Sequence, residues 1–324
     1  MTVHPRGQEI IKRAALQTET RSRGSNLLRR AWNDRTLYVL LLPVILFYLV
    51  FHYLPMYGVV IAFQDFNMFR GVFGSDWVGL ENFARIFTTS DFYTVLRNTL
   101  MLNFLTLVVG FPAPIILALL LNEVRKLGFK RVIQTIAYLP HFLSWVIVAS
   151  LVITLLSPST GIVNHVIKAL GFEPVHFLGN EGWWVIVYVA SGIWKDAGWG
   201  TIIYLASLTA IDPNLYEAAR IDGAGRLKQT WHITLPGIAP TIVVLLLLNL
   251  GRIMAVGFDQ PFLLGNNAVI GVSDVISTYV YRIGLLTLDM SRSAAVGLFQ
   301  SVINFLALVF ANALSKRVRD EGIY

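Results

Sequence analysis

The chain has 324 residues, of which 55% are hydrophobic and only 14% are charged. Soluble domains carry roughly 25% charged residues, and the apolar residues here form long runs between short polar loops, so an ordinary water-soluble protein is excluded. The net charge of +7 comes from basic residues beside these runs, which indicates orientation and contact with anionic membrane lipid rather than a nucleic-acid partner. The absence of cysteine excludes disulfides, thiolate metal sites and cysteine nucleophiles.

The first 36 residues are basic and polar, and they lack the short apolar core of a cleavable signal peptide. Apolar residues such as Leu27 and Trp32 are interspersed with Arg, which fits an interfacial amphipathic element and a flexible basic leader equally well. We expect a cytoplasmic N-terminal tail over 1–36, a transmembrane domain over 37–315 and a cytoplasmic C-terminal tail over 316–324.

Six apolar runs are long enough to cross a bilayer, whose core of about 30 Å requires about 20 helical residues. They cover roughly 38–63, 96–121, 132–156, 183–208, 237–258 and 293–315. The sequence therefore predicts an all-α, polytopic membrane protein with about six transmembrane helices.

The orientation follows from the positions of Lys and Arg on alternate sides of these runs. Of the 26 basic residues, 18 lie on the side that holds both termini, and five lie on the opposite side. Cytoplasmic loops carry an excess of Lys and Arg, so both termini are predicted to be cytoplasmic. Two long external loops, 64–95 and 259–292, either contact an extracytoplasmic partner or simply cap the spans.

The cytoplasmic loop 212–236 carries its own helical signals. Asp212 is a good N-cap with Pro213 at the first helical position, and Gly223 permits the turn that ends this helix. A second short helix is expected to follow and to stop at Pro236. The first helix combines small, apolar and charged side chains, so it is either a docking element or a surface helix that covers the ends of the spans.

The same loop resembles the EAA loop of binding-protein-dependent ABC importer permeases. The shared elements are Glu217-Ala218-Ala219, Asp222-Gly223 and Ile233-Thr234-Leu235-Pro236, at the family's spacing and before the last two predicted spans. In that family the first short helix docks into a cleft of the ATPase subunit. The resemblance thus implies an ATPase-coupling role for Glu217, Ala218, Ala219, Asp222, Gly223, Leu235 and Pro236.

The resemblance extends over roughly 37–314. The stretches 57–63, 79–83 and 138–164 are similar to type I carbohydrate permeases of the oligo- and polysaccharide branch, such as maltose- or alginate-type subunits. This implies a multi-pass subunit of the bacterial cytoplasmic (inner) membrane that translocates a saccharide delivered by an extracytoplasmic solute-binding protein. It also implies a second permease subunit, homologous or identical, and two ABC ATPase subunits that bind ATP and Mg, with no cofactor in this chain.

Polar side chains within the spans are costly in lipid, so they should face the protein interior or a water-filled path. Lys195 lies mid-span near Trp194 and Trp199, which suits either recognition of a sugar or a buried charge pair with Asp196. The polar stripe of the last span suits either helix packing or the path. The candidate substrate-path residues are Trp194, Lys195, Trp199, Asn249, Arg252, Gln300 and Asn304.

Two intramembrane cations, Lys195 and Arg252, leave the charge of the substrate open. They either favour an anionic saccharide such as a uronate oligomer, or Arg252 neutralises Asp259 or a carboxylate of a partner subunit.

Several activities are disfavoured by missing motifs. No G-x-x-x-x-G-K-[ST] string occurs, so the chain is not itself the ATPase. Neither a G-x-S-x-G elbow nor metal-ligand spacing of His and carboxylates is present, so the chain is not expected to be an enzyme or to hold a metal. A secondary carrier that works without an ATPase remains the alternative, although no internal inverted repeat is evident.

Overall fold

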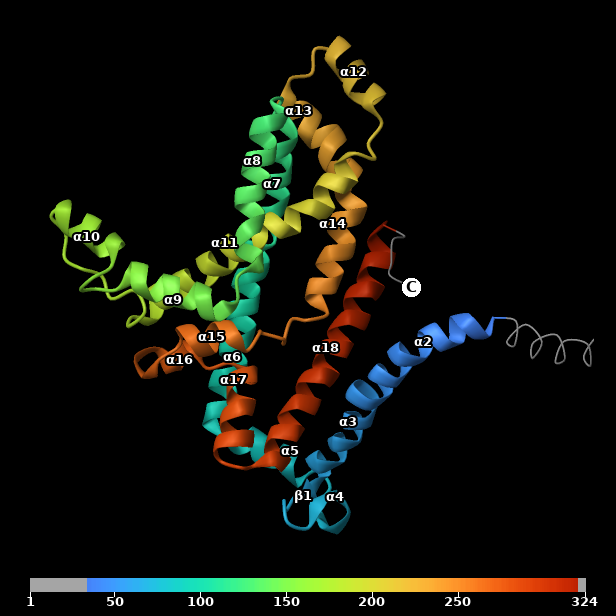
Figure 1. The fold of residues 1–324 in the computed structure, drawn as a ribbon, viewed down its shortest axis with the longest axis vertical. Coiled ribbons are helices and arrows are strands. Elements are labelled where there is room, and N and C mark those ends of the chain that lie inside the picture. The colour runs from blue at the N-terminus through green and yellow to red at the C-terminus, as the bar shows by residue number, and fades with distance from the viewer. Residues whose placement is uncertain (1–33, 320–324) are drawn as a thin grey trace, which may run out of the picture. The chain divides into compact units, whose positions relative to one another are not determined.

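The computed structural model describes residues 34–319, which form two compact units that divide between Val59 and Val60. The predicted tail is therefore outside the described residues up to position 33, as are positions 320–324. The first unit is a continuous helical run made of α2 (Arg35–Tyr48), the π turn η1 (Leu49–Tyr53) and α3 (Leu54–Met56) (Figure 1). None of its residues in these elements is buried, as expected for an apolar helix surrounded by lipid.

The second unit is almost entirely helical. Its elements are η2 (Tyr57–Phe63, which begins in the first unit), β1 (Gln64–Asp65), α4 (Gly71–Gly74), β2 (Asp76–Trp77), α5 (Glu81–Thr88), α6 (Ser90–Leu105), η3 (Thr106–Gly110), α7 (Pro112–Glu123), α8 (Leu127–Tyr138), η4 (Leu139–Phe142), α9 (Trp145–Leu156), α10 (Ile162–Ala169), α11 (Glu181–Leu208), α12 (Pro213–Ile221), α13 (Arg226–Gln229), η5 (Thr230–Thr234), α14 (Leu235–Leu250), α15 (Asp259–Leu264), η6 (Asn267–Val269), α16 (Ile270–Ser273), α17 (Ile276–Tyr281), η7 (Arg282–Leu286) and α18 (Met290–Arg319). Strands β1 and β2 pair antiparallel, with Gln64 opposite Trp77.

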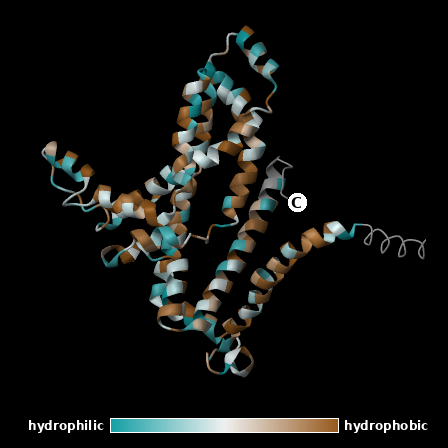
Figure 2. Cartoon of the chain, in the orientation of Figure 1, coloured by the Kyte–Doolittle hydropathy of each residue, from teal (hydrophilic) through white to brown (hydrophobic). Residues whose placement is uncertain are grey.

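Four helical stretches are long and apolar enough to cross a membrane. They are Arg35–Phe63, Ser90–Glu123, Arg226–Leu250 and Met290–Ala313. Two further apolar pairs are bent, Leu127–Phe142 with Trp145–Leu156 by 104°, and Asn267–Ser273 with Ile276–Leu286 by 118°. Counting each pair as one span gives up to six among residues 34–319. Figure 2 shows hydrophobic residues, in brown, along these helices. The predicted all-α, polytopic fold is confirmed.

Three predicted stretches differ in detail. The third predicted span is bent rather than straight, because Pro140 lies in η4 and Ser144 then caps a new helix by accepting a hydrogen bond from the Ile147 N–H. The fifth ends as a helix at Leu250 rather than near 258. The predicted loop 259–292 is largely helical and contains the second bent pair.

Helix α11 is central in the second unit and packs against α7, α14 and α8. It has 28 residues and coincides with the fourth predicted span, although it is not among the apolar stretches above. Its buried residues recur every three or four positions and include Ser191, Lys195 and Thr201. A Cβ atom on Gly198 would lie 1.9 Å from the carbonyl oxygen of Ala137 in α8, so only glycine allows these helices to approach so closely.

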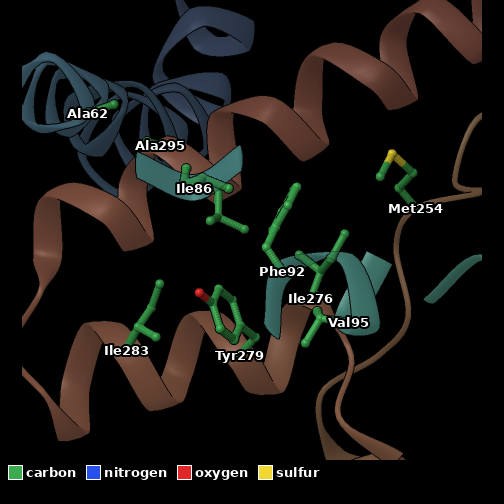
Figure 3. Close-up of a cluster of buried hydrophobic side chains, with 10 residues drawn as sticks. Ala62, Ile86, Phe92, Val95, Met254, Ile276, Tyr279, Ile283 and Ala295 are labelled. Atoms are coloured by element: carbon green, nitrogen blue, oxygen red, sulfur yellow. The ribbon is translucent and has the colours of Figure 1, made fainter. Parts of the chain in front are cut away.

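A separate apolar core joins α5, α6, α17 and α18. Its largest side chains include Ile86, Phe92 and Tyr279, which lie near one another in Figure 3. Beside it, the buried Asn82 side chain donates to the carbonyl oxygens of Ala62 and Gln64, at 3.0 and 2.9 Å. These two bonds therefore fix the hairpin formed by β1 and β2 onto α5, beside the apolar core.

Candidate substrate cavity and coupling loop

A cavity of about 430 Å³ lies among α6, η3, α7, α11, α14 and the segment that follows α14. Its wall is mainly apolar, with Leu107, Phe111 and Ile253 among the lining residues. The polar side chains of the lining are Asn103, Thr106, Tyr188, Asp196, Tyr204, Asn249 and Gln260. Such a concave, largely apolar site with a few convergent polar groups is typical of a small-molecule binding site.

Amide groups at the cavity wall differ in how they are used within the chain. The Nδ2 atom of Asn103 is buried and has no hydrogen-bond partner among the described residues. By contrast, Asn249 donates to the Leu245 carbonyl oxygen at 2.8 Å, and Gln260 donates to the Tyr188 carbonyl oxygen at 2.7 Å. A buried donor left unpaired is costly, so the Asn103 amide would gain a hydrogen bond if its side chain turned toward the cavity that the residue lines.

Asp196 is the only charged residue in this lining, and it is held by His141 at the bend between η4 and α9. Its Oδ1 atom lies 2.9 Å from His141 Nδ1, and the His141 ring stacks on Trp199 with 4.7 Å between ring centroids. The Nζ atom of the buried Lys195 donates to the His141 carbonyl oxygen at 2.8 Å and lies 5.7 Å from the Trp145 ring centroid. Lys195 is thus engaged in packing at the bend, not in a pair with Asp196.

Gln300 and Asn304 of α18 both bind the backbone of Met254. The side chain of Gln300 donates to the Met254 carbonyl oxygen at 2.5 Å, and Oδ1 of Asn304 accepts from the Met254 N–H at 2.9 Å. Helix α14 ends at Leu250, so the backbone N–H and C=O groups of Met254 have no helical partners and need partners from another element. The two side chains therefore hold the non-helical segment that closes one side of the cavity.

The structure brings only one predicted path residue, Asn249, into the cavity lining. Trp194, Trp199 and Arg252 are exposed on this chain, and they remain predictions for a path shared with a second subunit. Sequence reasoning missed Asn103, Tyr188, Tyr204 and Gln260. Asn103, a polar residue inside an apolar run, carried a usable signal, whereas the two tyrosines are ordinary residues of a membrane helix.

The predicted coupling helix is present as α12. Asp212 accepts a hydrogen bond from the Asn214 N–H at 2.9 Å, Pro213 begins the helix, and Gly223 turns the chain with φ of +73°. No residue of α12 is buried, and Ile221 just before the turn is 87% exposed. The helix therefore presents free apolar surface, as a docking element does.

Three contacts hold α12 and the loop that follows it, two within residues 212–236 and one to α7. The Tyr216 hydroxyl lies 3.1 Å from Thr234 Oγ1 in η5, and Gln229 donates to the Ala224 carbonyl oxygen at 2.7 Å. Arg226 at the start of α13 forms an ion pair with Glu123 at the end of α7, at 3.1 Å. The loop is thus attached to α7 and α14, two helices that line the cavity.

The predicted stop at Pro236 is wrong. Residues Arg226–Leu250 form one continuous helical stretch, in which the π turn η5 directly precedes Leu235 and Pro236. A proline within a helix lacks an N–H and clashes with the carbonyl four residues earlier. The wider π turn relieves that clash, so the coupling loop continues into α14 without a break.

The class of polytopic membrane transport subunits is defined by apolar spans around a cavity that holds a few polar side chains, and by an exposed, capped helix joined to the cavity walls. The chain belongs to the family described as "Binding-protein-dependent transport system inner membrane component", whose model matches residues 110–320. It is the membrane-spanning permease subunit of an ATP-driven ABC importer, with the type I fold.

Similar proteins agree over nearly the whole chain. The polygalacturonan/rhamnogalacturonan transport system permease protein YteP of Bacillus subtilis (strain 168) is 49% identical over 298 residues, covering 92% of this chain and 93% of that protein. A crystal structure of a bacterial ABC transporter involved in import of the acidic polysaccharide alginate matches with a TM-score of 0.84 and 43% identity, over 91% of this chain and 99% of that one. The same values hold for that transporter in complex with an alginate pentasaccharide-bound periplasmic protein.

Proposed function

We propose that the chain forms one half of the membrane pathway for oligosaccharide fragments of an acidic polysaccharide. The observation that carries this proposal is the 49% identity, over 92% of the chain, to a permease named for polygalacturonan and rhamnogalacturonan. The similarity to an alginate importer points to the same substrate class, because all three named polysaccharides contain uronate sugars. A neutral oligosaccharide is the competing substrate.

The cavity supports a saccharide by its chemistry. Asn103 and Asn249 carry amides in a wall that is otherwise mainly apolar, and Tyr188 and Tyr204 add aromatic rings that are largely buried in it. Sugar rings have an apolar face and hydroxyl edges, which match aromatic side chains and amides respectively. The Asn103 Nδ2 atom is buried without a partner, and a turn of this side chain toward the cavity would let it donate to a sugar hydroxyl.

The substrate's carboxylates are proposed to interact with groups at the edge of this cavity. Asp196 is the one charged residue in the lining and would repel a uronate, and only a protonated His141 would offset its charge. Arg252 is exposed between Asn249 and Ile253, which both line the cavity. An uncovered cation beside the lining is suited to a carboxylate, and a second permease subunit would supply further groups.

Transport by this chain is proposed to require the partners of its family. A second permease, homologous or identical, completes the pathway, two ATPase subunits bind ATP and Mg, and an extracytoplasmic binding protein delivers the substrate. Helix α12 docks on one ATPase through Glu217, Ala218 and Ala219, and Gly223 sets its direction. We also propose that both termini are cytoplasmic, which is supported by the excess of Lys and Arg on that side of the spans.

Uptake into proteoliposomes tests the substrate class. The complete complex is reconstituted with its binding protein and supplied with labelled trigalacturonate or maltotriose. We expect ATP-dependent uptake of the acidic trisaccharide, reduced in Asn103→Leu and unchanged in the control Phe104→Leu, whose side chain is exposed beside it. Preference for maltotriose would overturn the acidic substrate, and uptake without an ATPase would favour a secondary carrier.

A further inference from the structure

The hairpin loop over 64–80 presents its apolar side chains outward. Five of them are largely exposed, with fractions of 59% for Met68, 99% for Phe69, 92% for Phe73, 65% for Trp77 and 68% for Leu80. We call these five residues the hairpin patch. Exposed apolar side chains grouped in one short loop mark a surface that meets a partner or a membrane.

Two polar side chains of the same loop bond to its backbone and hold it in shape. Gln64 is buried and donates to the Val72 carbonyl oxygen at 2.9 Å, while the Ser75 hydroxyl donates to the Gly71 carbonyl oxygen at 2.6 Å and accepts from the Asn67 N–H at 3.0 Å.

The outer surface of the loop is both apolar and charged. Beside the hairpin patch, Arg70 and Asp76 form an ion pair at 3.2 Å with side chains 61% and 79% exposed. A surface that combines exposed apolar and charged side chains suits the headgroup layer, which lies between the apolar core of the bilayer and water.

The location of the loop places it at the membrane surface. The Phe66 N–H donates to Ser291 Oγ at 2.9 Å, in the first turn of the membrane-spanning α18. The loop also leads through α5 directly into the membrane-spanning α6. In Figure 1, β1 and α4 lie near α5, beside the end of the bundle where α18 begins. At the ends of spans, aromatic side chains are enriched in the headgroup layer.

We propose that the hairpin patch inserts into the headgroup layer of the bilayer and anchors this end of α6 and α18 there. Lipid fits better than the binding protein, because a partner that leaves in each cycle would expose Phe69 to water, and interfaces of transient partners are about as polar as the remaining surface. The inference concerns this loop alone and does not depend on the identity of the substrate.

The absence of cysteine in this chain makes a direct test straightforward. Single variants Met68→Cys and Phe69→Cys receive a nitroxide spin label, and the complete complex is placed in nanodiscs of phosphatidylethanolamine and phosphatidylglycerol. The complex with the cysteine-free parent chain measures labelling of the partner subunits. Collision of the label with oxygen, which dissolves in lipid, is compared with collision with a water-soluble nickel chelate.

Two control sites bracket the result. Leu40→Cys in α2 provides the value inside the apolar layer, and Glu173→Cys, at an exposed charged position in the loop after α10, provides the value in water. We expect the oxygen-to-nickel ratio at positions 68 and 69 to lie between these controls and to remain unchanged when loaded binding protein is added. A ratio equal to that at position 173 would overturn the anchor. Protection from both reagents, with or without binding protein, would assign the patch to a protein interface and would also overturn it.

Discussion

Helices α11 and α12 follow one another in the chain, yet glycine serves opposite purposes in the segments that they form. Gly198 of α11 is needed because α8 leaves no space for a side chain, whereas Gly223 after α12 has open space around it and a φ of +73°. One glycine sets the distance between two packed helices, and the other sets the direction of an exposed one. Stability of the bundle and coupling to the ATPase should therefore respond separately to substitution.

The largest effect is expected for Gly198→Ala. The new Cβ atom would lie 1.9 Å from the Ala137 carbonyl oxygen, and a backbone atom cannot move aside as a side chain can. We expect destabilisation at the upper end of about 1–3 kcal/mol, measured as a lower thermal unfolding temperature of the detergent-solubilised chain. Gly182→Ala, on the same helix with its nearest contact at 3.5 Å, is the control. Equal stability of both variants would contradict the close approach of α8 and α11.

A smaller effect, on coupling rather than on folding, is expected for Gly223→Ala. An alanine with positive φ costs about 1–2 kcal/mol, which should redirect the chain after α12 and lower ATP-driven transport several-fold. The control is Gly225→Ala, because Gly225 has equally open space but a φ of −68°. ATPase recovery in pull-downs and uptake into proteoliposomes provide the measurements. A defect of the same size in both variants would show that backbone direction is not the cause.

Substitutions at Tyr216 and Thr234 test how α12 is joined to η5, which continues into α14. We expect Tyr216→Phe and Thr234→Val each to leave the complex assembled and to raise the number of ATP molecules hydrolysed per substrate. One hydrogen bond contributes about 1 kcal/mol, so the effect should be two- to fivefold. The double variant should be no worse than either single one, because both remove the same bond. Additive losses would exclude a role for the bond itself.

The smallest effect is expected at the ion pair between Glu123 and Arg226, whose side chains are 48% and 59% exposed. Exposed ion pairs contribute below about 1 kcal/mol and weaken in salt. We expect Glu123→Gln to raise the number of ATP molecules hydrolysed per substrate modestly at low salt and to leave it unchanged at high salt. The exchanged pair Glu123→Arg with Arg226→Glu should restore the original number. Failure of the exchange would indicate that one of the two residues acts on a partner subunit instead.

The coupling helix was predictable because its signals are local in sequence. Asp212, Pro213 and Gly223 occupy the start and end positions that helix capping requires, and each does in the structure what its residue type predicts. The membrane-spanning stretches were also predictable, since hydropathy alone identifies most of them. The bend at Pro140 and the continuation through Pro236 depend on how neighbouring turns adapt, which periodicity does not reveal.

The cavity was much less predictable, because its residues meet only through tertiary packing. Asn103 and Gln260 are far apart in the sequence, and neither belongs to a motif. Gln300 and Asn304 attracted attention as polar residues in a span, but their partner is the backbone of Met254, freed where α14 ends early. A polar residue in a membrane helix can thus be recognised as one that needs a hydrogen-bond partner. Its partner is known only once the neighbouring segments are placed.

The segment η3 (Thr106–Gly110), between α6 and α7, is a π turn, and this affects how related permeases are compared. A π turn bonds each residue to one five positions on instead of four, so it holds one additional residue relative to a regular α-helix. That residue rotates α7 against α6 by about 100°, which is one step of a helix with 3.6 residues per turn. A relative with a single-residue deletion across 106–110 would therefore keep Asn103 at the cavity but turn the counterparts of Phe111 and Pro114 away from it.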